Sequence, residues 1–568
     1  MKTLLSPYKR LLKLLNSDRK DIMQIYIYSL FIGLTNLSLP IGIQAIINFI
    51  QMGKISTSWL VLVFLVVGSI IFGGFLQLNQ LRLTERLQQK IFIRSSFEFA
   101  YRIPRFQWFS IKNQYAPELV NRFFDTLTIQ KGLPKILIDF STALIQLFFG
   151  LILLSVYHPF FIIFSIVLLV VLIIILYLTG KKGLSTSIQE SKYKYKVAFW
   201  LEEIARTMNT FRLAGKTELP LEKTNGLVNS YIQSRENHFK VLVFQYIQLI
   251  GFKALIAFFL LLIGGLLVIN QQMNIGQFVA AEIIIILVIG SVEKLILNLE
   301  NLYDVLTSID KIGAVTDIPI ERSGGKIILK TENKPFSVDI NQLNFKFSEQ
   351  NENLFEDFSL SIKSGQHTVI IGSDGSGKTT LLNLISNLYP IESGNISINQ
   401  IPISNLDLED LRTNIGEYVS QQQIFSGTIE ENISMKRPEI TMDEILWACE
   451  KTDLLTNIQT SKFGFQTELD PNGKNLSRTL SQKIILARCI VNRPKLLLID
   501  DQQRFTSSSL KNVDHLSDLL FDVNAPWTLI AATKNESWLH HFKQIIKLEK
   551  GKIEFQGTYQ EYKNKFQK

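Results

Sequence analysis

Residues Ile370 to Leu382 read IIGSDGSGKTTLL, and this stretch decides the fold class of the second half of the chain. Residues 372–379 fit the pattern G-x-x-x-x-G-K-[ST], whose glycines let the backbone curl so that several N–H groups face one anion. An apolar strand precedes the pattern and an amphipathic helix follows it, so the start of that helix adds positive potential at the same place. Lys378 can then reach the β- and γ-phosphates of a nucleotide, and the Thr379 hydroxyl can bind Mg²⁺.

The composition indicates a second, membrane-bound part. Hydrophobic residues make up 47% of the 568 residues, charged residues only 19%, and the mean hydropathy is +0.18, which is too apolar for an ordinary soluble enzyme. The net charge of +9 comes without a basic, aromatic-rich helix, so we expect cytoplasmic loops rather than nucleic acid to explain it. Cys449 and Cys489 lack metal-ligand spacing and form no disulfide framework.

Six apolar runs are long enough to cross a bilayer, which takes about 17–25 residues. They lie within Asp21–Lys54, with a kink expected at Pro40, and at about Trp59–Gln77, Ile136–Tyr157, Pro159–Gly180, Phe252–Ile269 and Ile275–Val292. Residues 1–20 are short and basic, and no small-residue cleavage site follows the next apolar run. We therefore expect a retained cytoplasmic segment rather than a signal peptide.

The charges of the connecting loops predict the orientation. The short links 51–57, 158–159 and 270–274 carry almost no charge. The two long links are rich in Lys and Arg, namely Arg82, Arg86, Lys90, Arg94, Arg102, Arg105, Lys181, Lys182, Lys192, Lys194 and Lys196. Because cationic loops stay inside, both long links and both termini are expected in the cytoplasm.

The two long links, residues 78–134 and 181–240, keep helical periodicity, so the spans are expected to continue below the membrane as helices. Each link contains a break. The short pieces Glu118–Arg122 and Arg206–Arg212 either touch a cytoplasmic domain or form solvated turns, and both interpretations stay open.

Glu282 is an acidic residue inside the sixth apolar run. Such a charge is costly in lipid and usually faces a partner or a cavity. Two interpretations stay open: Glu282 lines a substrate path, or the span is displaced so that Glu282 lies near the outer interface.

The chain changes character near residues 318–334, which are polar and contain Gly324 and Gly325. We therefore predict a membrane domain at 21–315, a linker at 316–334 and an α/β nucleotide-binding domain at 335–568. About 120 residues after Lys378, the run PKLLLIDD (494–501) predicts a buried strand. Asp500 lies at the end of this strand, where it can hold the Mg²⁺ shell.

With these features in place, essentially the whole chain resembles an ABC exporter half-transporter, and its membrane half looks most like bacterial type I secretion exporters. The resemblance implies a membrane all-α six-helix domain plus an α/β P-loop NTPase (ABC ATPase) domain in the bacterial inner membrane. It implies that Phe347 stacks on adenine and that Mg²⁺ is held by Thr379, Asp500 and Gln421, although the spacing leaves Ser420 as an alternative at the Q-loop position. It assigns the phosphate cradle of ATP to Gly372, Ser373, Asp374, Gly375, Ser376, Gly377, Lys378, Thr379 and Thr380.

The cassette departs from the family pattern at the positions that drive hydrolysis. The LSGGQ signature appears as LSRTL (476–480), in which Ser477 survives as a nucleotide contact. By resemblance, Asp501 takes the place of the catalytic glutamate, Lys534 that of the switch histidine, and RFTS (504–507) that of the D-loop. We therefore predict retained MgATP binding with weak hydrolysis.

The sequence leaves two functions from different classes open. The first is an exporter subunit that moves a substrate out of the cytoplasm by ATP-driven alternating access. The alternative is an ATP-gated membrane scaffold or regulator that does not transport. The resemblance implies a dimer with itself or with another half-transporter, and it slightly favours the homodimer. A periplasmic adaptor, an outer-membrane channel and membrane lipid are the further partners it implies, and no nucleic acid is expected.

Overall fold

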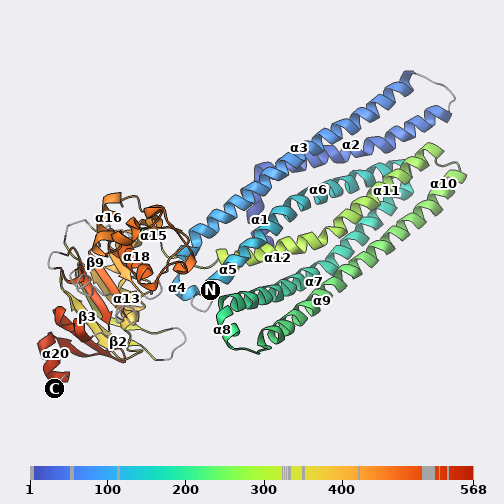
Figure 1. The fold of residues 1–568 in the computed structure, drawn as a ribbon. Helices are drawn as coiled ribbons and strands as arrows, with labels where there is room; N and C mark the ends of the chain where they lie inside the picture. Colours follow the sequence, from blue (N-terminus) through green and yellow to red (C-terminus); the bar gives the residue numbers. More distant parts are fainter. Residues whose placement is uncertain are drawn as a thin grey trace. The chain divides into compact units, whose positions relative to one another are not determined.

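The computed structural model describes residues 6–566 except 52–56, 112–114, 323, 325–326, 328, 330–333, 348–351, 420–422, 502–518, 523–524 and 534–535. The chain forms two compact units, Met1–Ile320 and Glu321–Lys568 (Figure 1). The boundary between them lies inside the segment 316–334 that the sequence predicts as a linker. Each unit is described by itself below.

The first unit is built from long helices, and six stretches of it are long and apolar enough to cross a membrane. This confirms the predicted number of spans. Its main elements are α2 (Arg19–Gln51), α3 (Thr57–Arg102), α6 (Asp125–Tyr157), α7 (Pro159–Arg206), α9 (Leu219–Phe259), a π-helical turn (Leu260–Gly264), α10 (Gly265–Ile269), α11 (Ile275–Leu297) and α12 (Leu299–Thr316).

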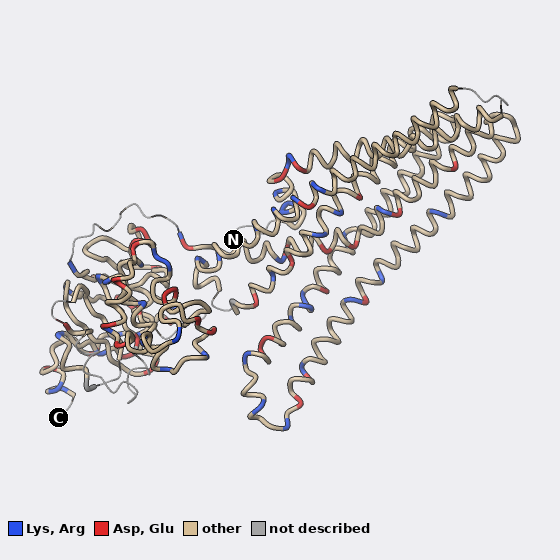
Figure 2. Tube along the Cα trace, turned by 45° about the horizontal axis from the view of Figure 1, so that its top comes forward, with Lys and Arg blue, Asp and Glu red and all other residues tan. Residues whose placement is uncertain are grey.

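The helices extend well beyond the hydrocarbon layer. The 48 residues of α7 rise about 72 Å at 1.5 Å per residue, against a hydrocarbon thickness of about 30 Å. Figure 2 shows that the ends of the long helices away from α8 and α12 are nearly bare of charged residues. The predicted continuation of the spans as helices is therefore confirmed.

Short helices interrupt both long links where the sequence predicts breaks. The first link contains a 3₁₀ turn at Ile103–Arg105, α4 (Trp108–Ile111), α5 (Ala116–Asn121) and a second 3₁₀ turn at Arg122–Phe124. The second link contains α8 (Met208–Leu213), where Leu213 is 88% exposed. Proline at the start of α5 and glycine after α8 account for these helix ends.

Polar groups inside the apolar helices find partners on neighbouring helices. Between α2 and α3, the Gln80 amide donates to Ser29 Oγ over 2.7 Å. Between α9 and α11, Lys253 forms an ion pair with Glu293 at 2.7 Å. These contacts satisfy groups that would be costly to leave unpaired in lipid, and sequence inspection did not anticipate them.

Glu282 lies seven residues into α11, about 10 Å from the N-terminal end of that helix, and is partly buried. This position agrees with both interpretations of the residue. In the link just before α11, Met273 is only 3% exposed, because it packs into the core formed by α6, α7, α9 and α11.

The N-terminal segment contains a helix that the sequence analysis did not predict, α1 (Pro7–Ser17), which packs on α12. Arg10 Nη2 donates to Asp317 Oδ2 over 2.6 Å. The Arg10 guanidinium crosses Gly313, where an added Cβ would lie 1.4 Å from Nη1. The guanidinium can take this position because residue 313 has no side chain, and a larger residue there would displace it.

The second unit contains an α/β core and a smaller antiparallel sheet, which confirms the predicted fold class. The six-stranded sheet has the order β12-β11-β3-β10-β9-β6, and all its neighbouring strands are parallel except β11 and β12. These strands are β3 (Thr368–Gly372), β6 (Ile415–Tyr418), β9 (Leu496–Asp501), β10 (Thr528–Thr533), β11 (Gln544–Glu549) and β12 (Lys552–Gly557). Residues 528–533 are all buried, as expected for a parallel sheet covered on both faces.

The antiparallel sheet has the order β2-β1-β4-β5, and a two-stranded ribbon joins β7 to β8. The strands are β1 (Val338–Phe345), β2 (Phe355–Ile362), β4 (Ser393–Ile398), β5 (Ile401–Pro402), β7 (Gly427–Thr428) and β8 (Glu468–Leu469). The helices are α13 (Lys378–Ile385), α14 (Leu408–Thr413), α15 (Ile429–Ser434), α16 (Met442–Lys451), α17 (Leu455–Gln459), α18 (Arg478–Ile490) and α20 (Tyr559–Phe566).

Candidate functional site

The phosphate-binding loop connects β3 to α13, and its shape depends on glycine. Gly372 and Gly377 have φ angles of +154° and +103°, in a region that side chains disfavour. An added Cβ would lie 2.1 Å from Leu548 O at the first position and 2.9 Å from Phe355 Cζ at the second. Only glycine therefore permits this loop, as the sequence pattern predicts.

Lys378 points back into the loop. Its side chain is almost fully buried, and Nζ donates to Gly372 O over 2.9 Å, to Ser373 O over 2.7 Å and to Ser376 Oγ over 3.3 Å. An ammonium has three donors and no acceptor. Phosphate oxygens can take over these donors with stronger, charge-assisted bonds, so the loop is suited to hold an anion.

Two oxygen-bearing side chains meet beside this loop. Thr379 Oγ1 donates to Asp500 Oδ2 over 2.6 Å, and Asp500 is buried near the end of β9. A hydroxyl and a carboxylate are the hard oxygen ligands that Mg²⁺ prefers, and the cation commonly shares them with nucleotide phosphates. The residues present therefore fit a Mg²⁺ ion. The third predicted ligand, Gln421, and its alternative, Ser420, lie outside the described residues.

The remaining residues of the predicted cradle occupy the loop and the first turn of α13. Ser373 Oγ donates to both carboxylate oxygens of Glu549, over 3.0 and 3.1 Å, which attaches the loop to the end of β11. Ser376 is buried, Asp374 and Gly375 are exposed, and Thr380 is partly buried. Their contact with nucleotide stays a prediction.

Phe347 lies two residues beyond β1 and is partly buried. Its ring meets Phe345 edge-on with centroids 5.2 Å apart, and Tyr389 edge-on at 6.0 Å. Two aromatic neighbours therefore support the ring that the family resemblance assigns to adenine stacking.

The altered signature forms the start of α18. Ser477 is the N-cap of this helix, because its Oγ accepts from Leu480 N over 3.2 Å. Ser477 and Arg478 are both exposed. The serine thus has a structural role in this chain, and an arginine side chain stands where family members carry glycine.

The structure places one predicted catalytic position, Asp501, at the end of β9. In the β9–β10 register, the Asp501 backbone pairs with Thr533 at the end of β10. The Asp501 side chain, Lys534 and the predicted D-loop (504–507) lie outside what the structure describes. Their roles stay predictions.

Glu417 is a residue of the site region that sequence reasoning missed. It lies on β6, mostly shielded from solvent, and Ser386 Oγ donates to its Oε1 over 3.3 Å. Burial is the main reason why the pKa of the Glu417 carboxyl is raised to about 7; the hydrogen bond from Ser386 and the charge of Arg412 oppose this rise, and the charge of Asp500 adds to it. An acidic residue in the middle of the otherwise apolar strand IGEYV was the available signal.

Comparison with known proteins agrees with this architecture. Residues 22–292 match the ABC transporter transmembrane region and residues 355–503 match the ABC transporter domain. The chain is therefore an ABC half-transporter of exporter architecture, a multi-pass membrane protein with its nucleotide-binding cassette fused to its membrane domain.

Its relatives are bacterial. The putative multidrug export ATP-binding/permease protein YgaD of Bacillus subtilis is 26% identical over 52% of this chain and 51% of its own length. The alpha-hemolysin translocation ATP-binding protein HlyB of Escherichia coli is 27% identical over 53% of this chain and 42% of its own. The chain thus spans about half the length of these relatives. A bacterial Atm1-family ABC exporter with ATP bound shares the fold, with a TM-score of 0.84 over 96% of both chains at 17% identity.

Proposed function

We propose that this chain is the MgATP-binding subunit of a dimeric exporter in the bacterial inner membrane. Its termini and cassette face the cytoplasm, and it moves a substrate outward by ATP-driven alternating access while hydrolysing ATP slowly. The relatives YgaD and HlyB are named for multidrug export and for alpha-hemolysin translocation, and these names support transport out of the cytoplasm. The loop charges support the orientation.

The observation that carries the proposal is the contrast between the loop at Gly372–Thr379 and the start of α18. The loop has its glycine geometry, its buried lysine and its Thr379–Asp500 pair. Lys378 would hold the β- and γ-phosphates, and Thr379 with Asp500 would hold Mg²⁺. At the start of α18, Ser477 Oγ is engaged by its own helix, and Arg478 adds bulk where close backbone approach is needed.

We therefore expect ATP binding to be retained while ATP hydrolysis is slow. A carboxylate at Asp501 is one methylene shorter than glutamate, and a lysine at Lys534 has no acceptor with which to orient water. A shift of about 1 Å in a catalytic group can cost about 100-fold in rate. ATP then serves mainly to close the dimer, and its hydrolysis becomes the slow step.

We propose a homodimer, as in the secretion-type exporters that the membrane half resembles. Each site of such a dimer would use the loop of one chain and the altered signature of the other. A periplasmic adaptor and an outer-membrane channel follow from the same resemblance. Within each chain, α5 with the following turn and α8 are proposed to contact the cassettes and transmit closure to the membrane helices.

The test uses the purified full chain in lipid vesicles. We expect MgATP retention in the parent and in Lys363→Ala, an exposed lysine of the cassette, and loss of retention in Lys378→Ala. We expect turnover well below the roughly 1–10³ s⁻¹ typical of enzymes. Turnover in that range without a partner ATPase would refute slow hydrolysis.

The same vesicles separate an exporter from a scaffold. With co-purified cargo supplied outside inverted vesicles, an exporter accumulates the cargo inside in an ATP-dependent manner. ATP binding without any accumulation would favour the ATP-gated scaffold instead.

A further inference from the structure

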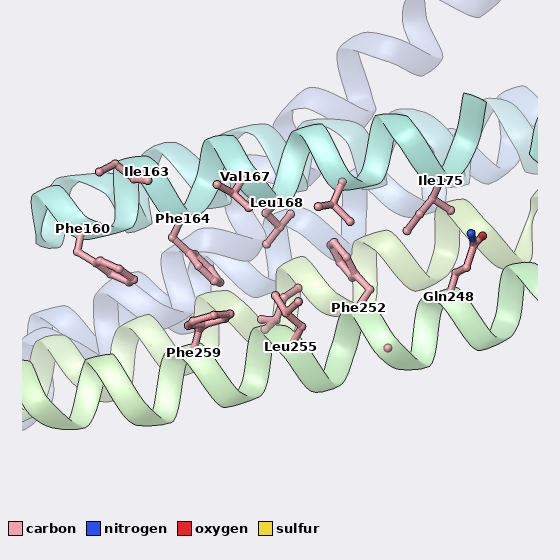
Figure 3. Close-up of a pocket in the computed structure, with 13 residues that line it drawn as sticks. Phe160, Ile163, Phe164, Val167, Leu168, Ile175, Gln248, Phe252, Leu255 and Phe259 are labelled. Carbon is pink, nitrogen blue, oxygen red and sulfur yellow. The ribbon is translucent and has the colours of Figure 1, made fainter. Parts of the chain in front are cut away.

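The helices α7 and α9 enclose a groove. The part of this groove that lies between the membrane-spanning stretches of the two helices is apolar and has a volume of about 400 Å³. Figure 3 shows side chains from both helices converging on it. The lining includes Phe160, Phe164 and Leu168 from α7 and Phe252, Leu255 and Phe259 from α9. Such a groove is suited to a hydrocarbon chain rather than to a polar ligand.

A second hollow of about 490 Å³ follows along the same two helices toward their cytoplasmic ends. The apolar groove uses residues 160–175 and 248–259, and the second hollow uses residues 178–189 and 237–244. Its lining mixes apolar side chains with polar and cationic ones, which are Lys182, Thr186 and Gln189 from α7 and Asn237 and Lys240 from α9. The groove therefore changes from apolar to basic along its length.

The two lysines have no acidic partner. Both are exposed, they face the same hollow from neighbouring helices, and within the described part of the chain neither forms an ion pair. Lysine pairs at the cytoplasmic end of membrane helices attract anionic lipid headgroups. An anion between Lys182 and Lys240 would satisfy both charges at once.

Gln248 lies between the apolar and the basic parts of the groove. It lines the apolar part, and its Oε1 is buried without a hydrogen-bond partner. An unsatisfied buried amide is costly, and a Gln amide can turn to offer either N–H or C=O. A polar group is therefore expected at this level, such as the ester region that joins a headgroup to its chains.

The apolar part of the groove is long enough for an acyl chain. From Gln248 to Phe259, α9 rises about 16 Å, and from Phe160 to Ile175, α7 rises about 22 Å, so a chain that enters beside Gln248 has room to extend past the middle of the roughly 30 Å hydrocarbon layer. Gly251 lies within this stretch, and an added Cβ there would meet no atom within 4 Å. The missing side chain leaves room for an occupant.

We propose that this groove binds one anionic phospholipid of the inner leaflet. Its phosphate lies between Lys182 and Lys240, its ester region lies at Gln248, and one acyl chain enters the apolar part from this level. The site does not depend on ATP turnover or on export, so it stands apart from the proposed function.

The test measures lipid retention by native mass spectrometry of the full chain from nanodiscs of phosphatidylglycerol and phosphatidylcholine. Each lysine near an anionic surface contributes attraction equal to about fivefold in affinity, so Lys182→Ala with Lys240→Ala should weaken phosphatidylglycerol binding about 30-fold. The matched control is Lys181→Ala with Lys192→Ala, which removes equal charge outside the hollow.

A second pair of variants adds a side chain inside or outside the groove, so that an effect of misfolding can be told apart from loss of the lipid site. Gly251→Leu fills the groove and should lower retention of both lipids, whereas Gly265→Leu, whose Cβ also meets no atom within 4 Å, should not. Equal retention in all variants, or no preference for phosphatidylglycerol in the parent, would overturn the proposal. A loss of dimer mass in Gly251→Leu with lipid retention unchanged would overturn it too, because the groove would then be an interface between two chains.

Discussion

Replacing Glu417 by Gln tests whether the acid buried on β6 makes the cassette sensitive to pH. Burial raises the pKa of Glu417 from its ordinary 4.5 to about 7 in the folded state. A difference of 2.5 pKa units at about 1.4 kcal/mol each gives at most about 3.5 kcal/mol. Gln keeps the shape of the side chain and removes the ionisation.

The sign follows from the raised pKa. Between pH 4.5 and 7 the folded state holds a proton on Glu417 that the unfolded state has released, so stability falls as pH rises. The contribution of the neutral carboxyl is fully present below about pH 4.5 and is lost as pH passes through about 7. At pH 8 the Gln variant should exceed the parent by up to about 3 kcal/mol, and at pH 5 by about 1 kcal/mol.

Hydrogen exchange of the β6 amides in the full chain, followed by mass spectrometry at pH 5 and pH 8, measures this difference between variant and parent. Each comparison is made at one pH, so the intrinsic exchange rate cancels. The exposed Glu392→Gln serves as control and should match the parent at both values. Equal protection of parent and Glu417→Gln at pH 8 would refute the reasoning, because the carboxyl would then ionise in the folded state without cost.

Three further outcomes are expected. Asp501→Glu combined with Lys534→His should raise ATP turnover by more than either change alone, up to about 100-fold, because water positioning needs both groups. Steady-state phosphate release measures this turnover, and small effects that simply add in the double variant would contradict the prediction. Arg478→Gly should raise turnover of the purified homodimer by restoring close approach at the start of α18, and an unchanged rate would contradict the idea that the Arg478 side chain obstructs this approach. A cysteine at Gln272, which is exposed in the link before α11, should react with an impermeant reagent from outside, and one at Lys192 only after permeabilisation; the opposite pattern would contradict the orientation.

The membrane helices could be predicted because the bilayer sets their length and composition. Apolar runs of fixed length predicted the spans, and the short links with few charged residues predicted where the spans end, including the break between α6 and α7 at His158. The helix α1 escaped prediction because its amphipathic face is recognised only once α12 is there to cover it. The ion pair between Lys253 and Glu293 is equally a product of packing, since the two residues are 40 positions apart.

The position and shape of the phosphate loop could be predicted because its backbone permits only glycine at two positions. The sequence also predicted that Thr379 and Asp500 would meet, although 121 residues separate them. It did not reveal that Ser477 caps its own helix, because that bond depends on the geometry of one turn. Glu417 was missed since a single charge in a short edge strand is usually solvated, and its shielding depends on the packing of β6 beside β9 and Ser386.

The ion pair between Arg10 and Asp317 connects α1 to the end of α12, so the two helices are expected to move together. A probe attached ahead of Pro7 would travel with the last turn of α12, from which the polypeptide continues to the cassette. Distance measurements from such a probe would therefore report how the exit of the bundle moves during a nucleotide cycle. The substitution Gly313→Ala, which would push the Arg10 guanidinium away, provides a matched preparation in which α1 is held on α12 by its apolar contacts without the ion pair.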